Sequence, residues 1–400
     1  MNSSSEPFIP MLHFASIGGG PHPQIFAAPQ RYIQGEGVLD RIGHYLAPLG
    51  LHSAGLLLSP RCEKAEGQRI ISSLQSAGSQ PVISHFNGEC SFDEIGGHVE
   101  TFSAAGKLDY LIAVGGGKAV DTGKCVAFRL GIPLVVVPTL ASNDAPCSAV
   151  SVIYTPSGED EAAEFFPQNP IMVIVDTGVI ANAAERYLVS GMGDAMATFY
   201  EARVCRECSH ALTAAGGRPT LAGAALGEIC AHTLYADGFA AAQACANSTV
   251  NDALERIVEA NTLLSGIGFE SGGLAAAHAV AQGCTAVASV RDNYLHGEMV
   301  AIGTLAQLAL EDKMDEAARV ADFFASVGLP THLDQIGLRA QQAQELAAIV
   351  AATLEFPFLP NMPFEVTGAD VHAALLKAHS LGEQVSANSG DSAWRKLHSR

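Results

Sequence analysis

Three glycines, a lysine and a polar loop follow two apolar runs in the first half of the chain. Residues 111–114 are apolar and lead through the glycines into Lys118, and residues 134–137 lead into a loop that reaches Asp144. Glycines let a backbone come close to a phosphate, and the N–H groups that open the next helix bind an anion. The spacing matches neither GxGxxG nor the Walker pattern, so an ordinary strand-to-helix turn is the alternative. Lys118, Asp121 one helical turn on and the nearby loop together favour phosphate binding.

Three residues in the second half of the chain have side chains of the kind that bind metals. Asp194 lies in the segment GMGDAMAT, His278 in GGLAAAHAVAQG, and His296 in LHGEMVAIG. A buried aspartate without a partner is costly, so Asp194 needs a cation or several donors. A single histidine in a helical region is usually structural, and the separations form no local motif such as HExxH. The spacing alone therefore leaves both a metal site and three structural residues open.

The hydrophobic pattern predicts a scaffold of two regions. Up to about Asp176 short apolar runs alternate with helical patterns, which is typical of a parallel, doubly wound α/β domain. The predicted strands are residues 54–58, 81–85, 110–114, 134–138 and 172–176, with a hairpin from residues 149–154 and 164–170. After Ala181 the pattern is all-helical. We expect an α/β domain over residues 31–180, a helical domain over residues 181–400, and a loose extension over residues 1–30.

Composition argues against several classes of function. The chain has 400 residues, 48% of them apolar and 16% charged, and a net charge of −19. Such an acidic chain is not expected to bind nucleic acid or an anionic membrane. We expect no membrane span, because no sufficiently long apolar run occurs, and no signal peptide, because no lysine or arginine precedes Arg31. The nine scattered cysteines indicate a reducing cytoplasm, and the Cys205-x-x-Cys208 pair alone is weak as a zinc site.

Long blocks of sequence resemble the iron-containing alcohol dehydrogenase superfamily, and most closely its glycerol dehydrogenase branch. The blocks include the GGGK turn, the loop PTLASNDAP, and the segments GMGDAMAT, FESGGLAAAH and YLHGEMVAIG. The resemblance extends from Arg31 to about Gly382. It implies a Rossmann-like parallel-sheet domain that binds a dinucleotide, followed by an all-α domain, the fold shared with dehydroquinate synthase.

The resemblance also implies the ligands and their residues. A metal would be held by Asp194, His278 and His296, and Asp144 would contact glycerol. Three protein ligands with an open position describe a catalytic zinc, with another divalent metal such as Fe²⁺ as the alternative. The cofactor would be NAD, with NADP as the alternative. The implied cofactor-binding residues are Ser59, Gly116, Gly117, Lys118, Asp121, Thr139, Ser142, Ser148, Val150 and Tyr154.

Three positions depart from the patterns of the superfamily. Other branches of the superfamily have a metal-binding histidine at the position of Thr198. The glycerol branch lacks that histidine, as this chain does, and this favours zinc. Ala281 stands where the glycerol branch has a second histidine, which puts a proton relay or polar contact there in doubt. The first predicted strand is followed by the turn Ser59-Pro60-Arg61. Near this turn the family often has an aspartate that holds the adenine ribose. An arginine can accommodate a 2′-phosphate, unless Arg61 merely faces solvent.

The expected activity is NAD(P)- and metal-dependent oxidation of glycerol, or a related vicinal diol, to dihydroxyacetone by hydride transfer. The alternatives on the same fold are a glycerol-1-phosphate dehydrogenase and a lyase like dehydroquinate synthase. The lyase would need a glutamate as the first metal ligand and basic residues for a phosphate, so Asp194 argues against it. A metal-free protein that binds NAD without turnover is left open by Ala281. The expected partners are a small polyol and, by family analogy, further copies of the chain.

Overall fold

A six-stranded parallel sheet forms the first part of the molecule. In the computed structural model, which describes residues 7–15 and 20–399, the strands follow the order β1-β8-β5-β4-β2-β3, and all of these pairs are parallel. The strands are β1 Tyr32–Gly35, β2 Ala54–Leu58, β3 Val82–His85, β4 Tyr110–Gly115, β5 Leu134–Pro138 and β8 Met172–Asp176. The helices that cover them are α2 Ile42–Leu46, α4 Gln68–Ser76, α5 Phe92–Ala104 and α6 Gly117–Leu130. The predicted α/β fold class is confirmed.

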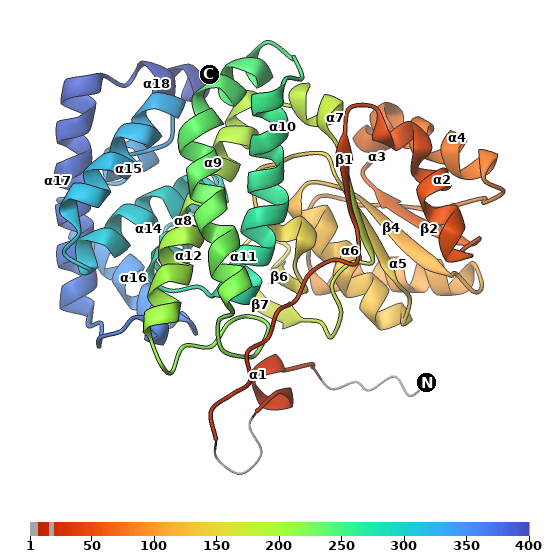
Figure 1. The fold of residues 1–400 in the computed structure, drawn as a ribbon, viewed down its shortest axis with the longest axis horizontal. Coiled ribbons are helices and arrows are strands. Elements are labelled where there is room, and N and C mark those ends of the chain that lie inside the picture. Colours follow the sequence, from red (N-terminus) through yellow and green to blue (C-terminus); the bar gives the residue numbers. More distant parts are fainter. Residues whose placement is uncertain (1–6, 16–19, 400) are drawn as a thin grey trace.

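Both faces of the sheet are covered, which explains why its strands are continuously apolar. Leu56 and Leu58 pack in one cluster with Ile42 and Ile70 of α2 and α4, whereas Leu57 belongs to a cluster on the side of α5 and α6 (Figure 1). Strand order reverses between β2 and β4, because the chain runs from β2 outward to β3 and from β4 the other way to β5 and β8. Ligands of doubly wound sheets bind at the carboxyl ends of the strands beside such a switch point.

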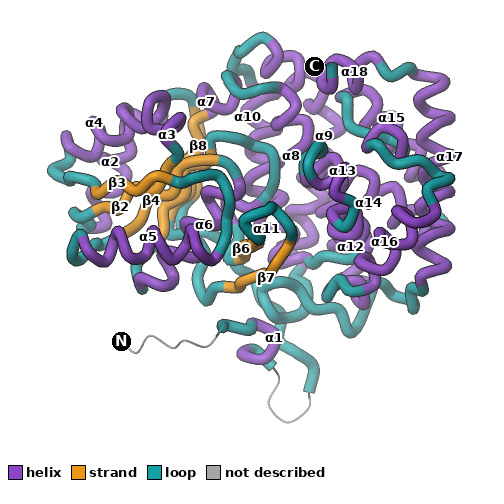
Figure 2. Tube along the Cα trace, turned by 180° about the vertical axis from the view of Figure 1, so that it is seen from behind, coloured by secondary structure: helices purple, strands orange, loops and turns teal. Residues whose placement is uncertain are grey.

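A two-stranded antiparallel hairpin follows β5, and it differs from the predicted one. Its strands are β6 Val150–Tyr154 and β7 Asp160–Phe165, so the second strand begins earlier than the predicted residues 164–170. The sequence of β7, DEAAEF, is charged, and none of its residues is buried, so an apolar pattern does not mark it. Strand β1 escaped prediction for a similar reason, because all four of its residues are only half-buried. Figure 2 shows the hairpin between the sheet and the helical region.

From Glu185 onward the described residues contain helices and no strand longer than an isolated bridge. The main helices are α8 Glu185–Glu207, α9 Leu221–Ala246, α10 Asp252–Glu259, α11 Ser265–Gly272, α12 Ala276–Thr285, α14 His296–Leu310, α15 Met314–Val327, α16 Ala343–Leu354, α17 Gly368–Ser389 and α18 Ser392–His398. One apolar cluster joins Val173 of the sheet to Met192 and Leu305 of the helices. The predicted domain boundary near residue 180 therefore stays a prediction. None of the described helices is both long and apolar enough to cross a bilayer.

The predicted N-terminal extension lies partly outside the described residues. Its described part includes the short helix α1 Pro10–His13, which lies below the body of the molecule in Figure 1. The carbonyl of His22 accepts a hydrogen bond from Arg218 Nε at 2.7 Å, and the N–H of Ala27 donates to Ser271 Oγ at 2.9 Å. These contacts attach this part of the chain to the helical region.

Candidate functional site

Asp194, His278 and His296 come together although up to 102 positions separate them, from 194 to 296. They lie on α8, α12 and the first residue of α14, and one ligand atom of each lies within 4.8 Å of the others. Asp194 Oδ1 is 3.2 Å from His278 Nε2 and 3.4 Å from His296 Nε2. Asp194 is fully buried, whereas the His296 side chain is 48% exposed. The cluster therefore has one side that a small ligand can reach.

Glycines allow the helices to carry these residues so close together. A Cβ atom at Gly193 would lie 2.3 Å from the carbonyl oxygen of Gly297, and one at Gly297 would lie 1.8 Å from that of Ser190. Helices α8 and α14 thus touch through their backbones beside Asp194 and His296. Gly303 does the same between α14 and α12, since its Cβ would lie 2.0 Å from the oxygen of Ala277. Gly193, the second glycine of GMGD, is needed for the close approach of α8 and α14.

The three residues fit a divalent cation. Two imidazole nitrogens and a carboxylate oxygen are the donors of catalytic zinc sites, and neighbouring ligands of a tetrahedral ion at about 2.0–2.1 Å lie roughly 3.3 Å apart. The observed distances of 3.2 and 3.4 Å agree with this spacing. Burial tends to raise the pKa of Asp194, but His296 and His278 outweigh it and hold that pKa below its usual range. The carboxylate is therefore ionised and ready to bind a cation.

Asp144 lies beside this cluster. Its backbone N–H donates to Asp194 Oδ2 at 3.1 Å, and its own Oδ2 accepts a hydrogen bond from Ser265 Oγ at 3.1 Å. Burial, followed by the negative charge of Asp194, raises the pKa of Asp144 to about 7. Two buried carboxyl groups side by side repel each other when both are charged, and a cation between them would relieve that repulsion.

The predicted phosphate turn lies at the carboxyl edge of the sheet. Gly116 precedes α6 in an extended conformation, and a Cβ atom at Gly117 would lie 2.4 Å from Asn143 Nδ2. The N–H of Thr139 donates to the carbonyl of Gly115 at 2.9 Å, so the loops after β4 and β5 lie together. Backbone N–H groups at a helix N-terminus can bind an anion such as a phosphate, so the position of this turn at the start of α6 is compatible with the predicted role.

Ser59 lies at the end of β2, next to β4 across the switch point. Its hydroxyl accepts a hydrogen bond from the N–H of Cys62 at 3.2 Å and caps the short helix α3 Pro60–Cys62. Arg61 and Thr139 both line a cavity of about 420 Å³ at this edge. The structure therefore brings the serine, the arginine and the glycine turn to one side of the sheet.

Lys118 and Tyr154 meet across α6 and β6. Lys118 Nζ lies 5.1 Å from the centre of the Tyr154 ring and 2.7 Å from Glu89 Oε2. The lysine side chain is 49% exposed, so its charge stays accessible at the edge of the hairpin. Ser142 lies in the loop between this edge and Asp194, and its carbonyl accepts from Ser190 Oγ at 3.3 Å.

Comparison with known proteins places this geometry in one family. Residues 29–177 match the family described as iron-containing alcohol dehydrogenase. A glycerol dehydrogenase from Escherichia coli O6:H1 is 43% identical over 364 residues, which cover 90% of this chain and 98% of that protein. The chain belongs to the iron-containing alcohol dehydrogenase family.

Two further proteins are similar to this chain over comparable lengths. A glycolaldehyde reductase from Halobacterium salinarum is 40% identical over 365 residues, covering 90% of this chain and 98% of that protein. The solved structure of glycerol dehydrogenase from Schizosaccharomyces pombe matches with a TM-score of 0.87 and 34% identity, over 92% of this chain and 93% of that one.

Sequence reasoning missed one buried lysine in this family member. Lys124 is 4% exposed and its Nζ donates to Asp121 Oδ1 at 3.1 Å and to Ser148 Oγ at 3.2 Å. It also donates to the carbonyls of Ala145 at 2.7 Å and Val150 at 2.6 Å. The ammonium group of Lys124 thus donates hydrogen bonds to three predicted cofactor-binding residues, Asp121, Ser148 and Val150. The Asp121-x-x-Lys124 spacing within an apolar helix was the available signal.

Two of the three positions that depart from the superfamily patterns, Thr198 and Ala281, have different surroundings. Thr198 is fully buried, and its hydroxyl lies 2.8 Å from that of Ser265, which in turn donates to Asp144. The threonine therefore supports the Asp144 loop from the position where other branches have a histidine. Ala281 is 1% exposed within an apolar cluster that includes Val300.

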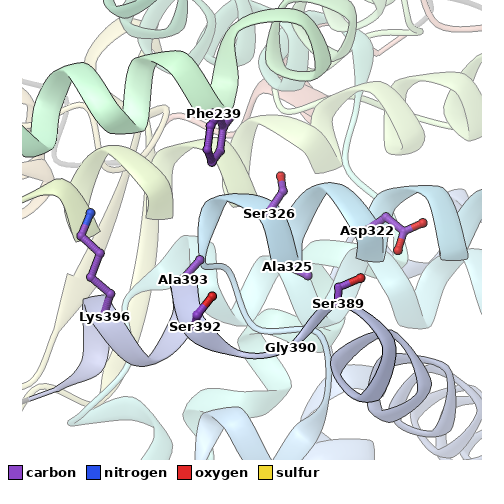
Figure 3. A pocket seen from close by; sticks show the side chains of 9 residues that line it. All are labelled: Phe239, Asp322, Ala325, Ser326, Ser389, Gly390, Ser392, Ala393 and Lys396. Atoms are coloured by element: carbon purple, nitrogen blue, oxygen red, sulfur yellow. The ribbon is translucent and has the colours of Figure 1, made fainter.

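A second cavity lies away from the predicted site. It has a volume of about 760 Å³ and opens between α9, α15 and the turn from α17 to α18, as Figure 3 shows. None of the predicted site residues lines it. Its lining residues are Phe239, Asp322, Ala325, Ser326, Ser389, Gly390, Ser392, Ala393 and Lys396.

Proposed function

We propose that the protein oxidises glycerol to dihydroxyacetone with a bound divalent metal and a nicotinamide cofactor. The observation that carries the proposal is the juxtaposition of Asp194, His278 and His296 with Asp144, whose neighbour Asn143 lies against Gly117 of the glycine turn. The 43% identity to a protein known as glycerol dehydrogenase, over 90% of this chain, supports the choice of substrate.

Each group has a distinct role in this proposal. Asp194, His278 and His296 would hold the cation, and Thr198 in place of a fourth, histidine ligand favours zinc over Fe²⁺. When bound, the cation supplies Lewis-acid stabilisation that lowers the pKa of a substrate hydroxyl. A bound nicotinamide cofactor, with NAD favoured over NADP, would supply the acceptor for the hydride of the carbinol carbon. Asp144, held by Ser265, would accept a hydrogen bond from a neighbouring hydroxyl and orient the diol.

The remaining residues would bind the cofactor. Gly116 and Gly117 would receive the pyrophosphate at the start of α6, and Ser59 would face the adenine ribose. The other proposed cofactor residues are Lys118, Asp121, Thr139, Ser142, Ser148, Val150 and Tyr154. We also assign the cofactor-binding part to residues 31–180 and the metal-binding part to residues 181–400.

A coupled oxidation assay tests the proposed activity. The zinc-loaded and the metal-stripped protein would be assayed with NAD and NADP against glycerol, 1,2-propanediol, glycerol phosphate and, in the reducing direction, glycolaldehyde. We expect metal-dependent oxidation of glycerol. Preference for glycerol phosphate would favour the phosphate-dependent alternative, and no turnover with any of them would favour a binding protein.

Asp144→Ala should lower kcat/KM for glycerol about 10–100-fold. The change removes the oxygen that would accept the diol hydroxyl, and a hydrogen bond to a charged group contributes about 1.5–3 kcal/mol. The backbone N–H that contacts Asp194 is kept. Ser265→Ala keeps the Asp144 carboxylate but removes its hydroxyl donor, together with the contact of that hydroxyl to Thr198, and should show a smaller loss. A fall in cofactor affinity with unchanged glycerol kinetics would mean that Asp144 serves the other ligand.

Ser59→Asp should reduce kcat/KM with NADP at least about tenfold relative to NAD, roughly 1.4 kcal/mol. An aspartate would accept hydrogen bonds from both ribose hydroxyls and repel a 2′-phosphate, whereas Arg61 could pair with one. Aspartate also caps helices well, so the turn should keep its shape. Arg61→Ala is the matched control for the phosphate contact. An unchanged ratio of the two cofactors would show that this turn does not face the ribose.

We further propose that the protein is a homo-oligomer of the cytoplasm. Leu221, Ile229 and Phe239 of α9 are 72%, 52% and 55% exposed, and large apolar groups on one helix suit a contact between copies. All nine cysteines are buried and unpaired, as expected in a reducing compartment. Light scattering of the purified protein would measure the oligomeric state.

A further inference from the structure

A second acidic residue of α8 holds the other side of the His278 ring. Glu201 follows Asp194 by seven positions, two helical turns, and is fully buried. Its Oε2 lies 2.5 Å from His278 Nδ1, while Asp194 Oδ1 lies 3.2 Å from Nε2. The same helix therefore contacts both ring nitrogens of one histidine.

The other oxygen of Glu201 is occupied as well. Its Oε1 accepts the backbone N–H of Ala275 at 2.7 Å and that of His278 at 3.0 Å, where α12 begins. Among the residues that the structure describes, His278 is the only basic residue that forms an ion pair with Glu201. This carboxylate thus has two tasks that differ in chemistry: one oxygen caps a helix and the other faces an imidazole.

We propose that Glu201 is a positioning residue that keeps the proton of His278 on Nδ1 and so leaves Nε2 free to bind the metal. A ligating histidine must be neutral at the nitrogen that binds, and the hydrogen bond at the other nitrogen selects the tautomer. Since Oε2 can only accept, it favours a proton on Nδ1. The inference rests on the metal site of the proposed function and adds the residue that prepares one of its ligands.

Glutamine at this position separates the two tasks. In Glu201→Gln the amide oxygen should stay with the two backbone donors, because turning it away would set the NH₂ group against both N–H groups. The NH₂ group would then face Nδ1, which would have to accept, and the proton would move to Nε2. The helix cap survives this change, but the histidine is left in the tautomer that cannot bind a metal through Nε2.

Zinc affinity of the metal-free protein tests the proposal. The dissociation constant for Zn²⁺ would be measured by competition with a coloured chelator for the wild type, Glu201→Gln, Asp194→Asn and the control Glu255→Gln. Glu255, like Glu201, accepts hydrogen bonds through both carboxylate oxygens, here from the side chains of Gln34 and Thr177. It lies on α10 and contacts none of the three metal-site residues, so it serves as the control. We expect Glu201→Gln to weaken zinc binding about 10–100-fold, with a thermal midpoint of the metal-free protein close to that of the control.

The outcomes distinguish this inference from the metal site beneath it. Wild-type zinc affinity in Glu201→Gln, together with loss of affinity in Asp194→Asn, would overturn the role of Glu201 and keep the metal site. Wild-type affinity in both variants would overturn the metal site itself. Equal losses in Glu201→Gln and Glu255→Gln would mean that Glu201 acts only through stability.

A measurement on the wild type decides the matter even if Glu201→Gln does not fold. ¹⁵N-histidine spectra of the metal-free protein, at an alkaline pH where the His278 ring is neutral, report which ring nitrogen carries the proton, and His278→Gln would identify the resonances. We expect a protonated Nδ1 and an unprotonated Nε2 at His278. A proton on Nε2 would overturn the proposal.

Discussion

Asp194→Asn should leave a folded protein that holds little metal and oxidises glycerol at least about a thousandfold more slowly. The side chain keeps its volume but loses the charge that the two histidines surround. Lewis-acid stabilisation contributes several kcal/mol to such a reaction, and about 4 kcal/mol corresponds to a thousandfold change in rate. Metal content by mass spectrometry and kcat with NAD would measure the two effects.

Asp237→Asn is the matched control for this variant. Asp237 of α9 pairs with Arg256 of α10, so the same chemical change there should alter neither metal content nor kcat. Undiminished turnover in a rigorously metal-stripped wild type would contradict the site. So would full zinc occupancy in Asp194→Asn.

Lys124→Met should lower the free energy of unfolding by about 3–5 kcal/mol. Burial raises the pKa of Asp121 and the charge of Lys124 opposes that rise. Removing the ammonium would leave a buried carboxylate without its partner and two backbone carbonyls, of Ala145 and Val150, without their donor. Urea unfolding followed by circular dichroism, in the absence of cofactor, would measure the loss.

Two further variants show whether the buried charge causes the loss. Lys118→Met removes a lysine that pairs with Glu89 but is 49% exposed, and such surface pairs contribute at most about 1 kcal/mol. Asp121→Asn added to Lys124→Met should recover part of the stability, because it removes the orphaned charge. Similar losses for Lys118→Met and Lys124→Met, without recovery in the double variant, would contradict the assigned role of Lys124.

The strands of the sheet core could be predicted closely from the sequence. Residues buried on both faces, such as those of β2 and β5, form apolar runs that end sharply at polar or proline residues. Strands β1 and β7 carry no such pattern, because they lie at an edge or in an exposed hairpin, where neighbouring strands and not burial determine the conformation.

By itself the sequence determined the fold class, the glycine turn, and the identities of Asp144, Asp194, His278 and His296 as candidates through resemblance. Only the tertiary structure decided that three of them share one cluster, because contacts between α8, α12 and α14 depend on how glycine-containing helices pack. It also decided the roles of Lys124 and Glu201, which are charged residues inside apolar helices. A buried charge is tolerated only where partners from distant parts of the chain surround it, and a linear pattern does not contain those partners.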